Sequence, residues 1–196
     1  MGERWTRWRF ERHAKEQLAP LYGMALRLTG RHEDAEDLVQ DTIVKAYQAY
    51  GGARFEGPAG FRGWLFTILA NGFRDRYRRR GRSPEVALEP SEDDPDAKVI
   101  ELVPDFAPGP EARAETTLLR EAAQGVMERM APEIRLAVTL FFVEGCTYQE
   151  IADITGCPIG TVMSRLWRGR RILRDKLARF GEEESVPARR RKVEGS

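Results

Sequence analysis

Apolar residues recur at the spacing of amphipathic helices on both sides of a long polar stretch, residues 83–112. In the first part a helix is expected over residues 10–29 and should end at Gly30. Its apolar stripe comprises Leu18, Leu21, Tyr22, Ala25 and Leu28. A second helix is expected over residues 34–50, with one broad buried face. That face consists of Ala35, Leu38, Val39, Ile43, Ala46, Tyr47 and Tyr50.

A loop and a third helix are expected next. Gly57, Pro58 and Gly60 mark the loop, and the helical pattern resumes at Phe61. Its packed positions should be Leu65, Ile68, Leu69, Phe73 and Tyr77. The first part of the chain is therefore expected to form a small helical domain over residues 14–82, after an N-terminal extension over residues 1–13.

Residues 83–112 interrupt the helical pattern. They contain six prolines, and nine acidic residues against the single Lys98 give them a net charge of −8. A segment of this composition cannot bury a core, so it is expected to be a flexible linker. Two roles stay open for it. It is either a passive spacer or a transient cover over basic surfaces elsewhere in the chain.

A second helical domain is expected over residues 113–180. Leu118, Leu119, Val126 and Met130 form one stripe, and Pro132 begins a new helix with an apolar body over residues 134–143. The remaining residues, 181–196, are polar and predict a disordered basic tail. The fold class expected from these patterns is all-α, with two small helical domains joined by a flexible acidic, proline-rich linker.

The C-terminal domain carries a helix-turn-helix pattern over residues 147–176. Thr147 and Glu150 have the spacing of a capping box at the start of a short helix. Gly156 is a suitable residue to end that helix. Cys157 is expected to cap the second helix and Pro158 to be its first residue. Two helices joined by so short a turn predict a DNA-binding unit.

The second helix of this pair divides into an apolar and a basic side. Val162, Leu166, Gly169, Leu173 and Leu177 fall on one side and should pack against the first helix. The other side presents donors that suit phosphates and guanine edges. We predict that the DNA-facing residues are Thr161, Ser164, Arg165, Trp167, Arg168 and Arg171. The alternative is an amphipathic surface helix whose arginines are simply solvated.

Two further patterns carry candidate chemistry in the first domain. One face of the expected second helix presents Asp37, Gln40, Asp41, Val44 and Gln48, which is either a solvated face or a dock for a basic helical partner. The loop and third helix combine aromatic residues, an amide and arginines. That combination suits single-stranded nucleic acid, although Phe61 and Trp64 can equally belong to the core.

Composition narrows the possible classes of protein. The chain has 196 residues, of which 41% are hydrophobic and 32% charged, and its net charge of +1 conceals basic and acidic blocks. Its N-terminus lacks the apolar segment of a signal peptide, and no run reaches the ~20 apolar residues of a membrane span. Cys146 and Cys157 lack the two further ligands that a zinc site needs, so free thiols in a cytoplasmic protein are expected, without metal or cofactor.

Three segments of the chain resemble the sigma-70 family of bacterial RNA polymerase initiation factors. They are AEDLVQDTIVKAY, FRGWLFTILANGFRDRYRRR and PIGTVMSRLWRGRR, in that order. More narrowly, the chain is similar to the small extracytoplasmic-function (ECF) group. The resemblance covers residues 14–82 and 113–178. It extends to a subgroup that is controlled by zinc-containing, thiol-sensing anti-sigma factors.

The resemblance implies specific partners and roles. Residues 14–82 correspond to sigma region 2, which docks on the β′ clamp helices of core RNA polymerase and opens the −10 element. Residues 113–180 correspond to region 4, which recognises the −35 element and touches the β flap. Core binding is then assigned to Asp37, Gln40, Asp41 and Val44. The unpaired −10 strand is assigned to Phe55, Phe61, Trp64 and Asn71, with Arg74, Arg76, Arg78 and Arg79 on nearby phosphates.

The sequence therefore predicts an alternative sigma factor that binds promoter DNA, core polymerase and a cognate anti-sigma factor. It is expected to be cytoplasmic, to contact no membrane and not to be an enzyme, because no P-loop, nucleophile–base pair or metal cluster appears. The main alternative is a stand-alone helix-turn-helix regulator. A second alternative is a nucleic-acid-processing enzyme.

Overall fold

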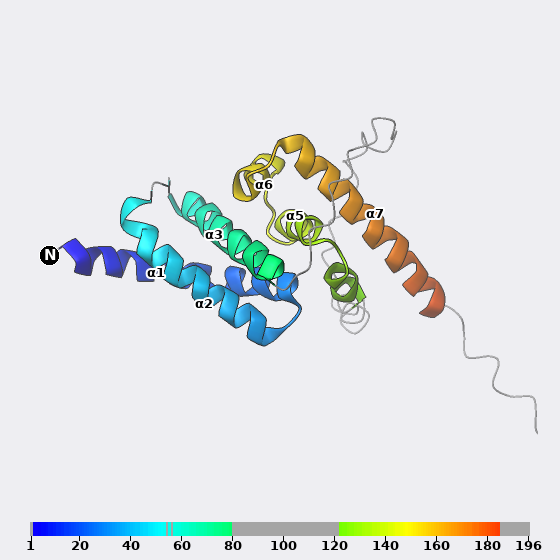
Figure 1. The fold of residues 1–196 in the computed structure, drawn as a ribbon, viewed down its shortest axis with the longest axis horizontal. Helices are drawn as coiled ribbons and strands as arrows, with labels where there is room; N and C mark the ends of the chain where they lie inside the picture. The colour runs from blue at the N-terminus through cyan, green and yellow to red at the C-terminus, as the bar shows by residue number, and fades with distance from the viewer. Residues whose placement is uncertain (1, 54, 56, 80–121, 185–196) are drawn as a thin grey trace, which may run out of the picture.

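A computed structural model describes residues 2–53, 55, 57–79 and 122–184 of the chain. The first part consists of α1 (Gly2–Thr29), α2 (His32–Ala49), the short 3₁₀-helix η1 (Tyr50–Gly52) and α3 (Gly57–Arg79). The second part consists of a helical stretch at residues 122–128, α5 (Pro132–Phe142), α6 (Tyr148–Thr155) and α7 (Ile159–Glu184) (Figure 1). The described residues contain helices and no strand, so the all-α prediction is confirmed. The expected linker lies outside them, as do residues 185–196 of the expected tail. Residues 181–184 continue α7, so the prediction of a disordered tail was wrong for these four residues.

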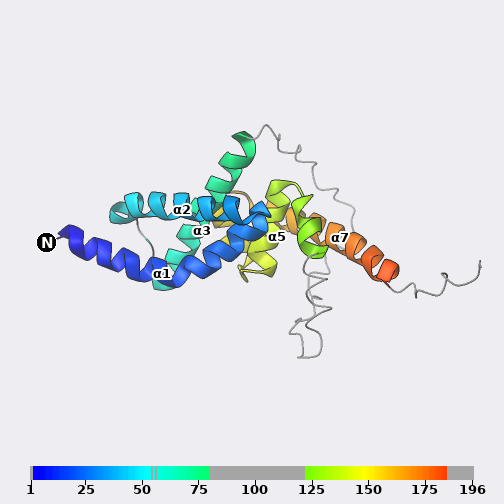
Figure 2. The same ribbon diagram turned by 90° about the horizontal axis from the view of Figure 1, so that it is seen from below.

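α1 begins earlier than the apolar stripe predicts. The helix starts at Gly2 rather than near Phe10, so the described part of the N-terminal extension continues α1 and projects beyond the other helices (Figure 2). Its end is as expected. Gly30 has a φ of 74°, which is the left-handed conformation that favours glycine, and its N–H bonds the carbonyl of Leu26.

α2 buries most of the predicted face. Ala35, Leu38, Val39 and Ala46 are buried, and Ile43 is half-buried. The prediction for Tyr47 was wrong, because its side chain is 48% exposed, although its ring makes a T-shaped contact with Phe10. Helical periodicity places Tyr47 at the border of the stripe, where the extent of the neighbouring helix decides burial.

α3 begins four residues before the predicted start, so the expected loop at residues 57–60 is instead the first helical turn. Pro58 is acceptable there because the first backbone N–H groups of a helix have no partner within it. α3 also buries more than one stripe, because it packs against α1, α2 and α6. Phe66 and Ala70 are therefore buried together with the predicted Leu65 and Leu69.

The two parts of the chain pack against each other. α1 and α3 both contact α5, and α3 contacts α6 (Figures 1 and 2). Buried residues of α1, α2 and α3 belong to the same apolar cluster as Leu136, Leu140 and Ile151 of the second part. The two expected domains thus share one continuous core among the described residues, although each is built from consecutive helices.

Candidate nucleic-acid interface

The helix-turn-helix is formed by α6 and α7, as predicted. Thr147 accepts a hydrogen bond from the N–H of Glu150, while the Glu150 carboxylate accepts from the Thr147 N–H at 2.7 Å, which completes the capping box. Gly156 ends α6 in the left-handed conformation, with a φ of 65°. α7 begins at Ile159, one residue after the predicted start at Pro158. These local features fix the angle at which α7 leaves α6.

The apolar side of α7 is packed closely against α5. Val162 and Leu166 are buried, and Gly169 lies so near α5 that a Cβ atom there would stand 2.2 Å from Cγ2 of Val138. Only glycine permits this approach. Since the back of α7 is held at this distance, the residues on its other side are directed away from the core.

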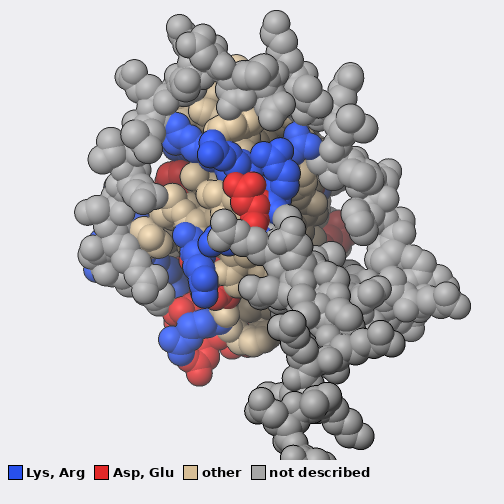
Figure 3. Space-filling model, turned by 90° about the vertical axis from the view of Figure 1, so that its right-hand side faces the viewer, with Lys and Arg blue, Asp and Glu red and all other residues tan. Residues whose placement is uncertain are grey.

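The predicted DNA-facing residues of α7 differ in how exposed they are and in the contacts that they make. Arg171 is exposed and its guanidinium lies 5.5 Å from the ring centre of Trp167. Thr161, Ser164, Trp167 and Arg168 are half-buried. Arg165 is engaged, because its Nη1 lies 3.3 Å from a carboxylate oxygen of Glu133 and donates to Sγ of Cys157. The end of the molecule at which α7 lies presents basic side chains with acidic ones between them (Figure 3).

The predicted single-strand residues lie around the start of α3. The rings of Phe55 and Trp64 are stacked, with centres 5.6 Å apart and planes at 26°. Both are half-buried, whereas Phe61 is only 2% exposed and packs beneath them against Phe10. The structure therefore brings an accessible aromatic pair together, and it places Phe61 in the core that supports this pair.

The polar residues of α3 that follow this aromatic pair lie on several sides of the helix and differ in their partners. Asn71 is exposed, and its side-chain oxygen accepts from Nη1 of Arg74 at 3.3 Å. Arg76 donates to Asp41 of α2, and Arg78 donates to Asp75. Arg79 is exposed at the end of α3. Carboxylates thus already occupy several of the arginines to which the sequence assigns DNA phosphates.

The predicted polymerase-docking face of α2 is exposed, although Asp41 already accepts a hydrogen bond from Arg76. Asp37, Gln40, Asp41 and Val44 are all exposed, and Val44 is 55% so. Tyr47, one turn beyond Val44 and two turns beyond Gln40, adds a second exposed apolar surface. Carboxylates followed along the helix by exposed apolar side chains offer both charged and apolar contacts to a basic amphipathic helix.

Four residues that sequence reasoning missed connect the two parts of the chain. Arg62 donates to the carbonyl and carboxylate of Glu144, at 2.8 and 2.9 Å. Glu133 of α5 binds Arg74 of α3. Arg135 of α5 is 6% exposed and donates to the carbonyl of Leu28 at 2.7 Å. One signal was available: Arg135 stands in the otherwise apolar run of α5, and a buried charge requires a partner.

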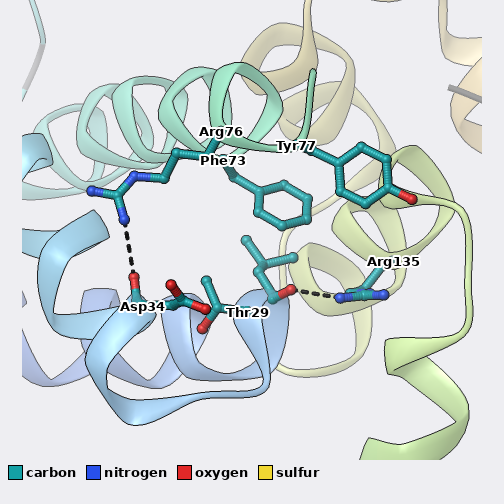
Figure 4. Close-up of a pocket in the computed structure, with 7 residues that line it drawn as sticks. Thr29, Asp34, Phe73, Arg76, Tyr77 and Arg135 are labelled. Carbon is teal, nitrogen blue, oxygen red and sulfur yellow. Dashed lines mark hydrogen bonds between the residues drawn. The ribbon is translucent and has the colours of Figure 1, made fainter. Parts of the chain in front are cut away.

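A small cavity of about 50 Å³ lies where these parts meet. Thr29, Asp34, Arg76 and Arg135 line it, and Figure 4 shows the bonds from Arg76 to Asp34 and from Arg135 to the backbone of α1. Ligand pockets usually enclose about 300–1,000 Å³. This cavity is therefore a packing gap in the seam, by which we mean the contact surface between the two parts of the chain, rather than a site for a nucleotide or cofactor.

The cysteines flank α6 as the sequence indicated. Burial raises the pKa of the Cys146 thiol to about 11, which keeps it protonated and unreactive at neutral pH. Cys157 is half-buried beside Thr155 and Arg165. Within the described ranges no group of three or more His, Cys, Asp or Glu residues could hold a metal ion. No helix in the described part of the chain is long and apolar enough to cross a membrane.

A capped helix-turn-helix with an arginine-bearing outer face, packed beside a helical unit with a stacked aromatic pair, defines a two-part helical DNA-binding protein. Residues 14–83 match the family described as Sigma-70 region 2, and residues 120–173 match Sigma-70, region 4. The chain therefore belongs to the sigma-70 family and, by its relatives, to the ECF sigma factors, a class that acts in transcription initiation.

Three curated relatives illustrate the match. The chain is 38% identical over 168 residues to the ECF RNA polymerase sigma factor SigE of Mycolicibacterium smegmatis. The matched residues cover 86% of this chain and 61% of SigE. It thus spans less than two thirds of that relative. It is 30% identical to the RNA polymerase sigma-H factor of Pseudomonas aeruginosa, over 78% of each chain. It is 31% identical to the ECF RNA polymerase sigma-E factor of Haemophilus influenzae, over 79% of this chain and 80% of that one.

Solved structures share the fold. The sigma factor RpoE, in its complex with the anti-sigma factor NepR from Bartonella quintana, has a TM-score of 0.61 at 31% identity. That match covers 86% of this chain and 96% of RpoE. CnrH, in complex with the cytosolic domain of CnrY, has a TM-score of 0.60 at 23% identity, over 88% of this chain and 90% of that one, and supports the fold alone.

Proposed function

We propose that this chain directs core RNA polymerase to promoters by recognising a −35 element in duplex form and capturing unpaired bases of a −10 element. The observation that carries the proposal is the pairing, within one chain, of a capped recognition helix and an accessible aromatic pair. A stand-alone regulator needs the first and has no use for the second. Region 2 is assigned to residues 14–82 and region 4 to residues 113–180.

α7 supplies the −35 contacts in this proposal. Ser164, Arg168 and Arg171 are placed at the base edges of the major groove, with Thr161, Arg165 and Trp167 on the backbone and flanking positions. The close packing of Gly169 against α5 supports this assignment, because a helix held by its back presents the opposite face to DNA.

Phe55 and Trp64 supply the −10 capture, supported from below by Phe61. Opening duplex DNA costs about 1.4 kcal/mol for each base-pair step. A base stacked on an aromatic side chain returns about 1–3 kcal/mol. Holding a few flipped bases therefore offsets much of the cost of local melting without ATP. Asn71 and the arginines of α3, Arg74, Arg76, Arg78 and Arg79, are assigned to the adjoining strand.

Core polymerase is the partner proposed for α2. Asp37, Gln40, Asp41 and Val44 would contact the β′ clamp helices, and region 4 would contact the β flap. Polymerisation chemistry then belongs to the partner, and this chain contributes binding and strand opening without a cofactor. The chain would act in the cytoplasm, where its polymerase partner works.

A cognate anti-sigma factor is a further proposed partner. The related RpoE was solved in complex with the anti-sigma factor NepR, which supports a regulator of the same kind here. We extend the proposal to a zinc-containing, thiol-sensing anti-sigma factor, on the resemblance of the sequence around residues 55–69 and 158–171 to that subgroup.

Transcription from purified components tests the proposal. Core polymerase with this chain should produce a transcript from its promoter, and core polymerase alone should not. Asp37→Lys should abolish co-purification with core, whereas Glu16→Lys, an exposed charge reversal on α1, should not. A chain that binds −35 duplex but supports no transcript would be a stand-alone regulator. Strand cleavage or modification by the chain alone would indicate an enzyme.

A further inference from the structure

One carboxylate, that of Glu133 in the first turn of α5, contacts an arginine from each proposed DNA-binding surface. Nε and Nη2 of Arg74 donate to its two oxygens at 2.9 and 3.0 Å. Nη1 of Arg165 lies 3.3 Å from one of the same oxygens. The side chains of Arg74, Glu133 and Arg165 are only 17%, 28% and 20% exposed. We call these three residues the Glu133 latch.

The geometry of the latch is that of phosphate recognition. The flat guanidinium group presents two parallel N–H donors that suit a carboxylate or a phosphate equally well, and Arg74 uses both on Glu133. Partial burial limits the screening of these charges by salt. Glu133 lies in the first turn of α5, where the helix dipole favours a negatively charged side chain, and this adds to the hold on its carboxylate.

Other contacts hold the surrounding seam closed. Arg62 of α3 binds Glu144, beyond the end of α5. Arg135 of α5 binds the last turn of α1 through the carbonyl of Leu28. α3 and α7 both pack against α5, and the Glu133 latch joins these two helices at the N-terminal end of α5.

This closed arrangement is incompatible with simultaneous binding of both promoter elements. Elements at −35 and −10 lie about 25 base pairs apart, on the order of 85 Å of B-DNA at about 3.4 Å per base pair. Yet Arg74 and Arg165 contact one carboxylate, each within 3.3 Å. One or both arginines must leave Glu133 before the two surfaces can reach their elements.

We propose that Glu133 is an internal substitute for a DNA phosphate, which occupies Arg74 and Arg165 and keeps the unbound chain closed. The proposal rests on the function proposed above, because it treats both arginines as DNA contacts. It deepens that function, since promoter DNA must displace Glu133, and the free chain therefore binds DNA more weakly than its separate surfaces allow.

Glu133→Gln in the full chain tests the latch. The amide keeps the shape of the side chain and removes the charge. We expect this variant to bind −35 duplex about fivefold more tightly at low salt, the effect of freeing one partly exposed charged pair. The slope of affinity against salt should steepen by about one, because one more phosphate is contacted. Glu16→Gln, an exposed site on α1, controls for the change in net charge.

Opening is measured separately, without DNA. Small-angle scattering of Glu133→Gln should give a larger radius of gyration than the wild type. Backbone amides of α3 and α6 should exchange with solvent faster. Glu133→Asp keeps the charge and should stay closer to the wild type in both measurements, which separates loss of charge from damage to α5. A normal circular dichroism spectrum checks the fold of each variant.

Binding and compactness equal to those of Glu16→Gln would overturn the latch. Transcription with core polymerase distinguishes this result from failure of the proposed function. If wild type and Glu133→Gln both support transcription but bind DNA alike, only the latch is wrong. If neither supports transcription while Glu133→Gln still opens and binds −35 duplex more tightly, the latch stands and the proposed role with polymerase is wrong.

Discussion

The helices α3 and α7 carry the same kinds of side chain, arginines and aromatics, but they are packed differently. α7 is packed closely along one side, where Val162 and Leu166 are buried, and its opposite side carries the exposed Arg171. α3 lies among α1, α2 and α6, and its arginines reach carboxylates of α2 and α5. In α7 most packing residues differ from the predicted DNA contacts, and the exception is Arg165, which binds Glu133 of α5. In α3 the buried Phe61, which packs, and the half-buried Trp64, which is assigned to recognition, lie in one aromatic cluster.

This difference decides how mutations should behave. A substitution on the outer side of α7 should change DNA binding and leave stability almost unchanged. Around the start of α3 a substitution should change both, in a ratio that depends on burial. Four predictions test this contrast, beginning with the largest expected effect.

The first prediction separates core from capture within the aromatic cluster. Phe61→Ala should lower the free energy of unfolding by about 3–5 kcal/mol, because Phe61 is 2% exposed and its loss leaves a cavity. Trp64→Ala should cost less stability but reduce promoter opening strongly, because a base loses a stacking partner worth about 1–3 kcal/mol. Chemical denaturation measures the first effect, and permanganate reactivity of unpaired thymines measures the second.

Phe66→Ala provides the matched control on α3, since Phe66 is buried and has no assigned DNA role. It should resemble Phe61→Ala in denaturation and support normal opening at temperatures where it remains folded. If Trp64→Ala destabilises the protein as much as Phe61→Ala and leaves opening unchanged, Trp64 is a core residue and the capture site must be sought elsewhere.

The second prediction concerns the packed side of α7. Gly169→Ala should destabilise the protein by about 1–3 kcal/mol, because its Cβ atom would stand 2.2 Å from Cγ2 of Val138, so that either this buried side chain or one of the two helices must shift. Gly160→Ala lies on the same helix with no atom within 4 Å of its Cβ, and it should be neutral or stabilising by up to about 1 kcal/mol. Thermal unfolding of the two variants gives the comparison, and equal melting temperatures would show that α7 is not held at this distance.

The features of α7 could be predicted from sequence because they are local. The capping box joins residues three apart, Gly156 ends α6 within the same turn, and the apolar stripe repeats along one helix. The same reasoning misplaced the start of α3 and the exposure of Tyr47. Both depend on neighbours that are distant in sequence. The burial of Tyr47, for example, is decided by how much of its ring α1 covers, and α1 leaves it 48% exposed despite the contact with Phe10.

The contacts between the two parts of the chain could not be predicted in this way. The partners of Arg74, Arg62 and Arg135 lie 59, 82 and 107 residues away. Helical periodicity predicts on which face of its own helix a residue lies, but it does not predict which other helix will pack against that face. The functional assignments along α3 needed the family resemblance, whereas the helix-turn-helix followed from the residues themselves.

The third prediction tests the open side of α7. Arg168→Ala should reduce the preference for promoter over scrambled −35 duplex by about 1–3 kcal/mol, the discrimination expected of an arginine that contacts guanine. Arg174→Ala, at an exposed site further along α7, should weaken binding to both duplexes alike and reduce the salt slope by about one. Titrations of both variants at several salt concentrations measure this. Full sequence preference in Arg168→Ala would assign Arg168 to the backbone instead.

The smallest expected effect concerns the capping box at the start of α6, where backbone and side-chain hydrogen bonds from Thr147 lower the pKa of Glu150. A carboxylate whose pKa is lowered by folding stabilises the fold at pH values above its unfolded pKa of about 4.3, and that stabilisation is lost as the pH falls through the lower folded value. Thr147→Ala should therefore cost about 1 kcal/mol at pH 7, and its difference from the wild type should shrink in acid. Glu150 is exposed, so solvent screening keeps the charged part of this effect small.

Urea unfolding between about pH 3 and pH 7 measures the difference, with Glu16→Gln as the control for an exposed carboxylate outside the capping box. A difference that stays constant across this range would mean that the hydroxyl of Thr147 stabilises α6 without help from the charge of Glu150. In either case −35 recognition should be unchanged once the protein is folded, because the outer face of α7 is not involved in the cap.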